Sequence, residues 1–394
     1  MTRSKKIVRT RKRRNKTVVF RGRKKTYRRG RALVHPVGSA WKEWNRRRPV
    51  QRTGMSEPPR PKLDLSAAYA AGAQAGTEAL QLYGRIDSNS PMSRSHFQSA
   101  LTEWFADHTA GNRPAYSEAL ALCSSYQKGY AASRQENESI YGVPLPLVAK
   151  ASAVITACNE EDTIGKVIDE LERLPLSEII VVLNGCTDNS FSKVAWRKNI
   201  ILVNFPDRLG HDVGRSVGAA LVTGDSILFV DGDMEVPAEE LGAFLYEREQ
   251  GADVVLNDIS RYLPHYERQD EVTRCKLYLN QALGRPDLRS SSLTAVPHVL
   301  SRKAVETVGT EMLSVPPKAQ AIAIIEGLAV AAPCSADVIS RNRLRQGNSG
   351  AGNSVLLLIL GDHLEALNEA IRRKGSKLSW ETASRSQLAK VRNG

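Results

Sequence analysis

The pattern of hydrophobic and polar positions changes at about Lys150. From there on, short apolar runs alternate with segments in which apolar residues recur every three to four positions. The runs predict buried strands, and the recurring positions predict helices that cover them. The expected strands are 152–157, 178–183, 199–205, 226–233 and 253–257, and the expected helices are 162–174 and 212–224. Alternation of this kind predicts an α/β fold with a mostly parallel sheet flanked by helices.

Two regions without this alternation precede it. Residues 64–145 are rich in Ala, Ser, Gln and Tyr and predict a small helical module, in which AYAAGAQAG at 68–76 is weakly echoed by SYQKGYAAS at 125–133. Residues 1–63 lack hydrophobic periodicity and predict a disordered basic arm. The expected segments are the arm at 1–63, the helical module at 64–145, the α/β domain at 146–345, and a C-terminal helix with a tail at 346–394.

The net charge of +14 is concentrated in the N-terminal arm. Residues 1–50 contain 20 of the 56 Lys and Arg residues and one acid, Glu43, whereas the rest of the chain has 36 basic and 41 acidic residues. A basic run of this density attracts polyanions without sequence readout, because each phosphate contact releases counterions. We expect non-specific binding through residues 3–48 to an anionic membrane surface, a glycopolymer or a nucleic acid; a solvated tail is the alternative.

The cysteines and the hydropathy of the chain indicate in which cellular compartment the protein is expected. The five cysteines are scattered without metal-ligand spacing, and the N-terminus has charge but no apolar leader segment. The longest late apolar run, VLLLIL at 355–360, is too short to span a bilayer. We therefore expect a cytoplasmic protein, peripheral at an anionic surface where the arm binds one.

The stretch ILFVDGDM at 227–234 brings Asp231 and Asp233 to the end of an expected buried strand. Buried carboxylates are costly without a cation, and Mn²⁺ or Mg²⁺ prefers such oxygen ligands; a solvated turn is the alternative. Three more strand ends carry polar or basic residues, in TACNEED (156–162), LNGCTDNS (183–190) and DRLGHDVGRS (207–216). Because parallel strands end at the same edge of a sheet, the four segments predict a site for a metal and a nucleoside diphosphate.

These segments resemble the family 2 glycosyltransferases, which have the Rossmann-like GT-A fold. The resemblance covers about residues 150–260, through ITACNEEDTIGKVIDEL, IIVVLNGCTDNS and ILFVDGDM. It implies an enzyme that moves a sugar from a nucleoside-diphosphate sugar to an acceptor, here unidentified, with Mn²⁺ or Mg²⁺ bound by Asp233 and Asp231. A weaker similarity to glucosyl-3-phosphoglycerate synthases rests on NEEDTIGKVID, LSVPPKAQAIAIIEGLAV (313–330) and RNR (341–343).

The resemblance also assigns roles to individual positions. The first strand end would line the nucleoside, Asn184 would face the base, and a basic side chain of the third segment would contact phosphate. The implied nucleotide-sugar-binding residues are Thr156, Ala157, Glu160, Asn184, Arg208, Gly210, Arg215 and Asp231.

The chain departs from the family pattern at several positions. Leu183 and Asn184 stand where family members usually have a pair of acids. Leu209 replaces a frequent lysine, and Ser340 replaces a late metal-binding histidine. Inverting members carry an acidic pair near the present VPPKAQ, which has none. Either the enzyme retains the configuration of the sugar, or Glu311 or Glu326 is the catalytic base. Asp233 is the third candidate catalytic residue. These departures leave open a polyanion-binding scaffold with a weak or inactive transferase domain.

The acceptor side is expected to be built from residues 258–345. Arg285, Arg289 and Ser291 are candidate contacts for a phosphate or carboxylate of the acceptor, and Asp258 is a further candidate. The sequence alone leaves the acceptor, the donor base and the stereochemical outcome undetermined.

Overall fold

The computed structural model describes residues 63–84, 90–110, 112–341 and 354–380. The chain divides into a unit of residues 1–34 and a unit of residues 35–394, and every described residue lies in the second unit. Apart from Leu63, the predicted basic arm therefore lies outside the described residues, as does the tail from 381 onward.

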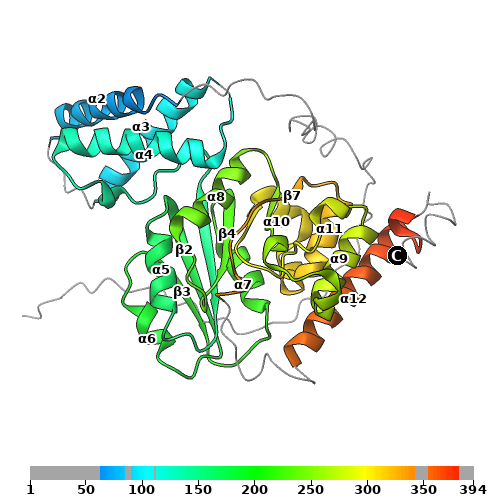
Figure 1. Cartoon of the computed structure of the whole chain (residues 1–394). Helices are drawn as coiled ribbons and strands as arrows, with labels where there is room; N and C mark the ends of the chain where they lie inside the picture. Colours follow the sequence, from blue (N-terminus) through cyan, green and yellow to red (C-terminus); the bar gives the residue numbers. More distant parts are fainter. Residues whose placement is uncertain (1–62, 85–89, 111, 342–353, 381–394) are drawn as a thin grey trace, which may run out of the picture. The chain divides into compact units, whose positions relative to one another are not determined.

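A seven-stranded sheet lies at the centre of the α/β domain (Figure 1). Its strands are β1 (Ala151–Ala157), β2 (Leu176–Asn184), β3 (Ile200–Phe205), β4 (Ser226–Asp231), β5 (Val254–Asn257), β6 (His298–Ser301) and β7 (Val330–Cys334). Their order across the sheet is β3-β2-β1-β4-β6-β5-β7. Strand β6 is antiparallel to both of its neighbours, whereas the other pairs are parallel. The predicted mostly parallel sheet is confirmed, and six strands share one direction.

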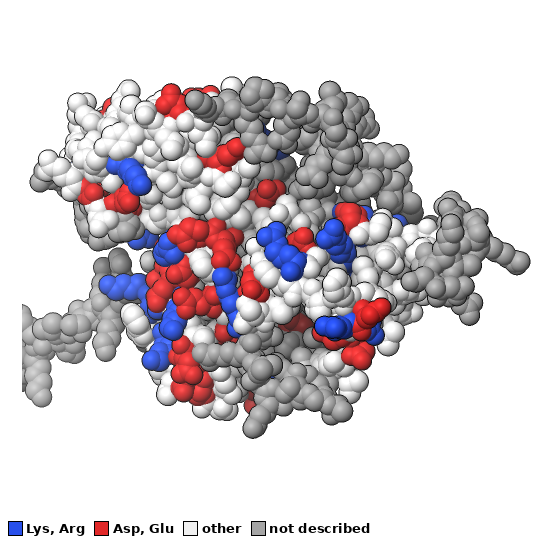
Figure 2. Space-filling view, in the orientation of Figure 1, with Lys and Arg blue, Asp and Glu red and all other residues white. Residues whose placement is uncertain are grey.

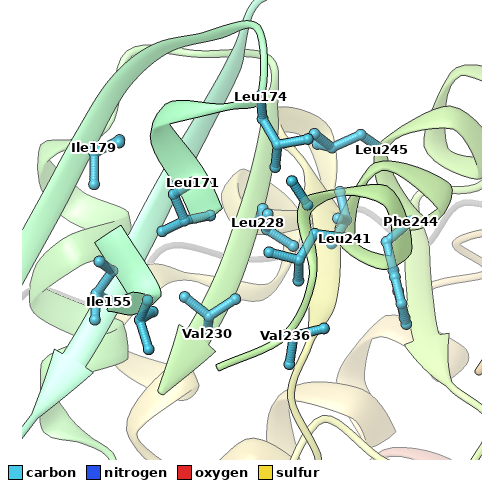
Figure 3. Packing of buried hydrophobic residues seen from close by; sticks show 14 of the residues in the cluster. Ile155, Leu171, Leu174, Ile179, Leu228, Val230, Val236, Leu241, Phe244 and Leu245 are labelled. Atoms are coloured by element: carbon cyan, nitrogen blue, oxygen red, sulfur yellow. The ribbon is translucent and has the colours of Figure 1, made fainter. Parts of the chain in front are cut away.

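Helices cover both faces of this sheet (Figure 1). One face is covered by α5 (Ile164–Glu172), α6 (Ser190–Ala195) and α8 (Ala238–Glu249), and the other by α7 (Val213–Leu221), α9 (Glu271–Ala282), α10 (Arg302–Val308), α11 (Pro316–Ile325) and α12 (Ser354–Lys374). Successive residues of a strand point to opposite faces, so Ile155 joins the first core and Val154 the second. Figure 3 shows Ile155 and Val230 packed with Leu171 and Leu241 in the first core.

Short 3₁₀ helices occupy several connections. They are η1 (Glu138–Tyr141), η2 (Ser260–Tyr262), η3 (Tyr266–Arg268), η4 (Pro286–Leu288), η5 (Thr310–Ser314) and η6 (Leu378–Trp380).

Residues 64–145 contain three long helices, α2 (Leu65–Tyr83), α3 (Pro91–Thr109) and α4 (Tyr116–Arg134). The weak sequence echo marks the crossing of α2 and α4. A Cβ on Gly72 would lie 1.9 Å from the carbonyl oxygen of Tyr126, and a Cβ on Gly129 would lie 2.0 Å from that of Tyr69. Each glycine thus lets the backbone of the opposite helix approach closely. The two contacts are reciprocal, since each joins a glycine of one echoed stretch to a tyrosine carbonyl of the other.

Glycines also bring α7 close to β1. A Cβ on Gly214 would lie 2.9 Å from Cγ2 of Thr156, and one on Gly218 would lie 2.3 Å from Cγ1 of Val154. The one-turn spacing of the two glycines lets α7 lie directly on the strand. The first turn of α7 is therefore fixed beside the carboxyl ends of β1 and β4.

Candidate functional site

Asp231 and Asp233 lie at the carboxyl end of β4, as predicted. Gly232 between them continues the sheet, since its N–H donates to the carbonyl of Thr156 at 2.8 Å. A Cβ on Gly232 would lie only 2.7 Å from Cβ of Ala157. The glycine of the Asp-Gly-Asp motif is thus required by space, and it holds both carboxylates at the sheet edge.

Arg215 of α7 organises the carboxylates at this edge. Its side chain is 6% exposed, and its guanidinium lies 3.2 Å from Oδ1 of Asp212 and 3.4 Å from Oδ2 of Asp231. The Thr156 hydroxyl donates to Oδ1 of Asp231 at 2.9 Å. Burial would lower the pKa of Arg215, but the charges of Asp212 and then Asp231 outweigh it and raise the pKa. Arg215 therefore stays charged and fixes the orientation of the Asp231 carboxylate.

A buried chain of hydrogen bonds extends from Arg215 to α11 and α9. Arg215 Nη1 donates to the carbonyl of Leu293 at 3.0 Å, and the N–H of Leu293 donates to Oε1 of Gln320 at 2.8 Å. Gln320 Nε2 donates to Oδ1 of Asn280 at 2.7 Å. Leu293, Gln320 and Asn280 are each 1% exposed. Groups on three helices and one loop thus hold the Asp-Gly-Asp edge through Arg215.

The donor set fits a hard divalent cation that a substrate helps to bind. Within the described residues, no group of three or more His, Cys, Asp or Glu side chains is arranged to hold a metal ion. Asp231 and Asp233 offer carboxylate oxygens from a rigid strand end, and both are partly exposed. Mg²⁺ is commonly bound by one or two carboxylates plus substrate phosphates, so two protein ligands suffice.

Asn184 anchors the loop between β3 and α7. Its Nδ2 donates to the carbonyl of Gly210 at 2.6 Å, and its Oδ1 accepts from the N–H of Leu209 at 2.8 Å. The expected contact of Asn184 with a base is not retained, because both ends of this buried amide are used by the loop. Gly210 has a φ of +142°, and Arg208 is exposed in the same loop.

The first two strand-end loops interlock. The N–H of Glu160 donates to Oγ of Ser190 at 2.8 Å, and the N–H of Glu161 donates to Oδ2 of Asp188 at 3.0 Å. Backbone hydrogen bonds to Asp188 and its bond with Ser190 outweigh burial and lower the pKa of Asp188. Glu160 and Ala157 are 5% and 6% exposed, which places them at the base of the edge rather than on its surface.

The two candidate bases differ in position. Because β7 runs in the same direction as β4, Glu326, four residues before β7, lies at the opposite edge of the sheet from Asp231. It is ion-paired with Arg373 at 2.5 Å, so its expected catalytic role is not retained. Glu311 lies in η5, and its side chain is exposed.

The acceptor candidates are mainly structural. Arg285 is 6% exposed and donates to Asp287 and to the carbonyl of Val330, at the edge opposite the Asp-Gly-Asp motif. Ser291 is 1% exposed, and its carbonyl accepts a hydrogen bond from Nδ2 of Asn280. The carbonyl of Arg289 accepts from the same amide. The fold therefore does not retain Arg285 or Ser291 as acceptor contacts, whereas the Arg289 side chain is exposed.

Asp258 and Ser340 stabilise local turns. Oδ1 of Asp258 accepts from the N–H of Ser260 at 2.9 Å, at the start of η2. The Ser340 hydroxyl donates to Oδ2 of Asp337 at 2.5 Å. Asp258 and Ser340 therefore each have a local partner that accounts for their presence.

Three further titratable side chains with shifted pKa values interact with charged groups of this edge, and sequence patterns gave no indication of two of them, Lys276 and Asp362. Burial, opposed by Asp270 and reinforced by Arg215, lowers the pKa of Lys276 on α9 to about 8. Burial and Arg215 lower the pKa of His298 to about 3, so this imidazole is neutral and stacks on Phe229. Burial raises the pKa of Asp362 on α12 to about 6, assisted by Asp212 and Glu365. Their roles depend on tertiary neighbours, which no local motif reveals.

Comparison with known proteins finds one family model that matches within this domain. Residues 152–306, less than half of the chain, match the model of glycosyl transferase family 2. A curated relative is the undecaprenyl-phosphate 4-deoxy-4-formamido-L-arabinose transferase of Yersinia pestis (strain Pestoides F), which is 30% identical over 118 residues, or 27% of this chain and 36% of the relative. The chain thus spans about a third of the length of the curated relatives it matches.

Two solved structures that the comparison finds are synthases. Glucosyl-3-phosphoglycerate synthase from Mycobacterium tuberculosis, in complex with Mn²⁺, UDP and phosphoglyceric acid, is 20% identical, with 57% of this chain and 78% of that chain covered and a TM-score of 0.40. Mannosyl-3-phosphoglycerate synthase from Rubrobacter xylanophilus is 17% identical, with 61% and 80% covered and a TM-score of 0.43. None of the helices in the described part of the chain combines the length and apolar character needed to cross a bilayer.

Proposed function

We propose that the α/β domain catalyses transfer of a sugar from a nucleoside-diphosphate sugar, with Mn²⁺ or Mg²⁺ bound. The family match over residues 152–306 carries this proposal. The arrangement of Asp231 and Asp233 at the carboxyl end of β4 supports it, because ligands of parallel α/β sheets bind at that edge. The scaffold alternative is not favoured, since the motif and its supporting contacts are intact.

The residues of the edge have distinct roles in this proposal. A bound divalent cation supplies Lewis-acid stabilisation of the charge that develops on the leaving diphosphate. Asp233 and Asp231 would hold it. Thr156 and Arg215 keep the Asp231 carboxylate oriented, and the exposed Arg208 is placed in the loop that Asn184 anchors, where it can meet a phosphate.

We further propose an acceptor that carries a phosphate group. The curated relatives are named for transfer involving undecaprenyl phosphate. In this chain, Lys276 adds a second cation near Arg215 on the side of α9. An anionic acceptor would relieve the repulsion between these two cations. Of the two candidate bases, only Glu311 remains for an inverting reaction, and a retaining reaction needs neither.

The test uses the full chain, titrated calorimetrically with UDP, GDP and ADP sugars with and without Mn²⁺, and assayed for release of the nucleoside diphosphate. We expect one base to bind in a Mn²⁺-dependent manner, and Asp233→Asn to lower both metal-dependent binding and turnover by about 100-fold or more. Asp225→Asn is the matched control, because Asp225 is exposed before the amino end of the same strand. Binding of no nucleotide sugar by a folded chain, or equal losses in both variants, would overturn the proposal.

A further inference from the structure

An apolar stripe runs along the outer side of α12. Leu357, Leu364 and Ile371 are 61%, 67% and 42% exposed, and Leu358 beside the first of them is 44% exposed. The first three are spaced by seven residues, so they lie in a row on one face of the helix. We call these four residues the apolar stripe. An aligned row of exposed aliphatic side chains usually marks a contact surface.

The stripe is separate from the face by which α12 packs on the domain. His363, Ala366 and Ala370 are at most 1% exposed, and both alanines belong to the core that α9 and α11 also form. The helix is therefore held in place by its other side, and the stripe is not needed for that packing. Figure 1 shows α12 at the periphery of the α/β domain.

The charges on α12 leave a surplus of cations at its C-terminal end. Glu365 pairs with Lys318 at 2.5 Å, and Glu369 accepts from Arg372 and from the next arginine at 2.5 and 2.6 Å. Lys374 and Lys377 follow, and both are exposed. On the face shown in Figure 2, acidic side chains gather over α5 and α8. Residues 354–377 carry three acids and four bases, and all four bases lie at the Ile371 end of the apolar stripe.

We propose that α12 docks the protein on an anionic lipid surface, with the apolar stripe in the interface and the basic N-terminal arm adding electrostatic attraction. Interfacial helices bind through apolar area together with attraction of Lys and Arg to anionic headgroups. The N-terminal 50 residues supply 20 Lys and Arg, and one acid. The inference concerns a surface away from the Asp-Gly-Asp edge and is independent of the proposed sugar transfer.

A second copy of the chain is a less suitable occupant. A stable protein–protein interface buries about 800 Å² on each partner and uses roughly 20–30 residues a side. The apolar stripe offers four exposed aliphatic side chains, with Gly361 and Asn368 between them. This is a narrow ridge, which suits insertion into a headgroup layer better than pairing of two proteins.

The test is flotation of the full chain with vesicles of phosphatidylcholine alone or mixed equally with phosphatidylglycerol. We expect binding to the anionic vesicles, and a fall in apparent affinity of about ten-fold or more when Leu357, Leu364 and Ile371 are all changed to Ser. The matched control changes Leu82, Trp196 and Ile201 to Ser, because these side chains are 72%, 71% and 43% exposed elsewhere on the molecule. The control should bind as the unchanged chain does.

Three results would overturn the proposal. Unchanged vesicle affinity in the stripe variant would mean that the arm alone accounts for binding. Equal losses in the stripe and control variants would indicate non-specific apolar adsorption. A dimer of the unchanged chain that the stripe substitutions convert to a monomer, by sedimentation velocity without vesicles, would assign the stripe to a second copy. Circular dichroism of each variant confirms that the fold is intact.

Discussion

Replacing Gln320 with methionine tests whether the buried hydrogen-bond chain positions the Asp-Gly-Asp edge. Methionine is close to glutamine in length and fills the same space, so the change mainly removes the amide. Three partners lose a hydrogen bond, but one of them, the Ser291 carbonyl at 3.3 Å from Nε2 of Gln320, keeps its bond from Asn280. The other two become orphaned. The N–H of Leu293 loses its acceptor at 2.8 Å, and Oδ1 of Asn280 loses its donor at 2.7 Å.

The size of the effect follows from these two orphaned groups. Each buried polar group left unsatisfied costs about 1–3 kcal/mol, so Gln320→Met should lower the free energy of unfolding by about 2–6 kcal/mol. Asn280→Leu should also lower the free energy of unfolding, because the carbonyls of Arg289 and Ser291 lose their donor Nδ2 and Gln320 loses an acceptor. Urea denaturation of the full chain measures both quantities.

The substitution should also weaken nucleotide binding. Leu293 loses one anchor, and its carbonyl holds Arg215 at 3.0 Å, so the orientation of Asp231 is loosened. We expect Mn²⁺-dependent nucleotide affinity to fall about ten-fold, with metal-independent binding unchanged. Gln127→Met is the matched control, because Gln127 is 6% exposed and donates to the carbonyls of Glu138 and Gly142 in the helical module.

Two outcomes would refute the reasoning. The first is an equal loss of nucleotide affinity in Gln127→Met, which would reduce the effect to general destabilisation. The second is a Gln320→Met variant that is destabilised as expected and yet binds Mn²⁺ and nucleotide normally, since Arg215 would then hold Asp231 without the buried chain.

Two further predictions concern single side chains. Gly232→Ala should destabilise the fold by about 1–3 kcal/mol, because the new Cβ would lie 2.7 Å from Cβ of Ala157. Gly361→Ala on α12 should stabilise the fold by about 0.5–1 kcal/mol, because its new Cβ meets nothing within 4 Å. Thermal denaturation distinguishes the two variants, and equal effects would contradict the steric argument. Burial, followed by the charges of Asp212 and Glu365, raises the pKa of Asp362 from 3.8 to about 6, and the charge of His211 opposes this shift. The folded state therefore loses stability as the pH rises and Asp362 ionises. Asp362→Asn should therefore raise Tm at pH 8 and leave it unchanged near pH 3, and a pH-independent difference would refute this.

The first half of the sheet was predictable because its strands are locally marked. The expected strands at 152–157, 178–183 and 199–205 agree with β1, β2 and β3 within two residues at each end. The expected strand at 226–233 ends earlier, at Asp231, where the residue pairing with β1 stops, and Gly232 adds one further hydrogen bond to Thr156. The C-terminal helix expected within residues 346–394 is α12. By contrast, β6 is four buried residues, His298–Ser301, too short for any periodicity to distinguish it from a loop.

The same limit explains which site residues were predictable. Asp231 and Asp233 follow a recognisable strand, so their edge could be predicted from sequence. The role of Asn184 could not be, because it depends on the return of the loop at 209–210 to the end of β2. Glu326 was misplaced because its edge depends on the reversal of β6, which the sequence does not show.

That reversal has a consequence for how proteins with this fold can diversify. Because β5 ends and β6 begins at the same sheet edge as Asp231, residues 258–297 leave that edge and return to it. The segment contains α9 with Lys276, and it meets the rest of the domain at two neighbouring strand ends. Such a loop can be lengthened, shortened or exchanged as a cassette between related proteins. A lineage can thus alter what binds at this edge while leaving the strands at 151–231 as they are.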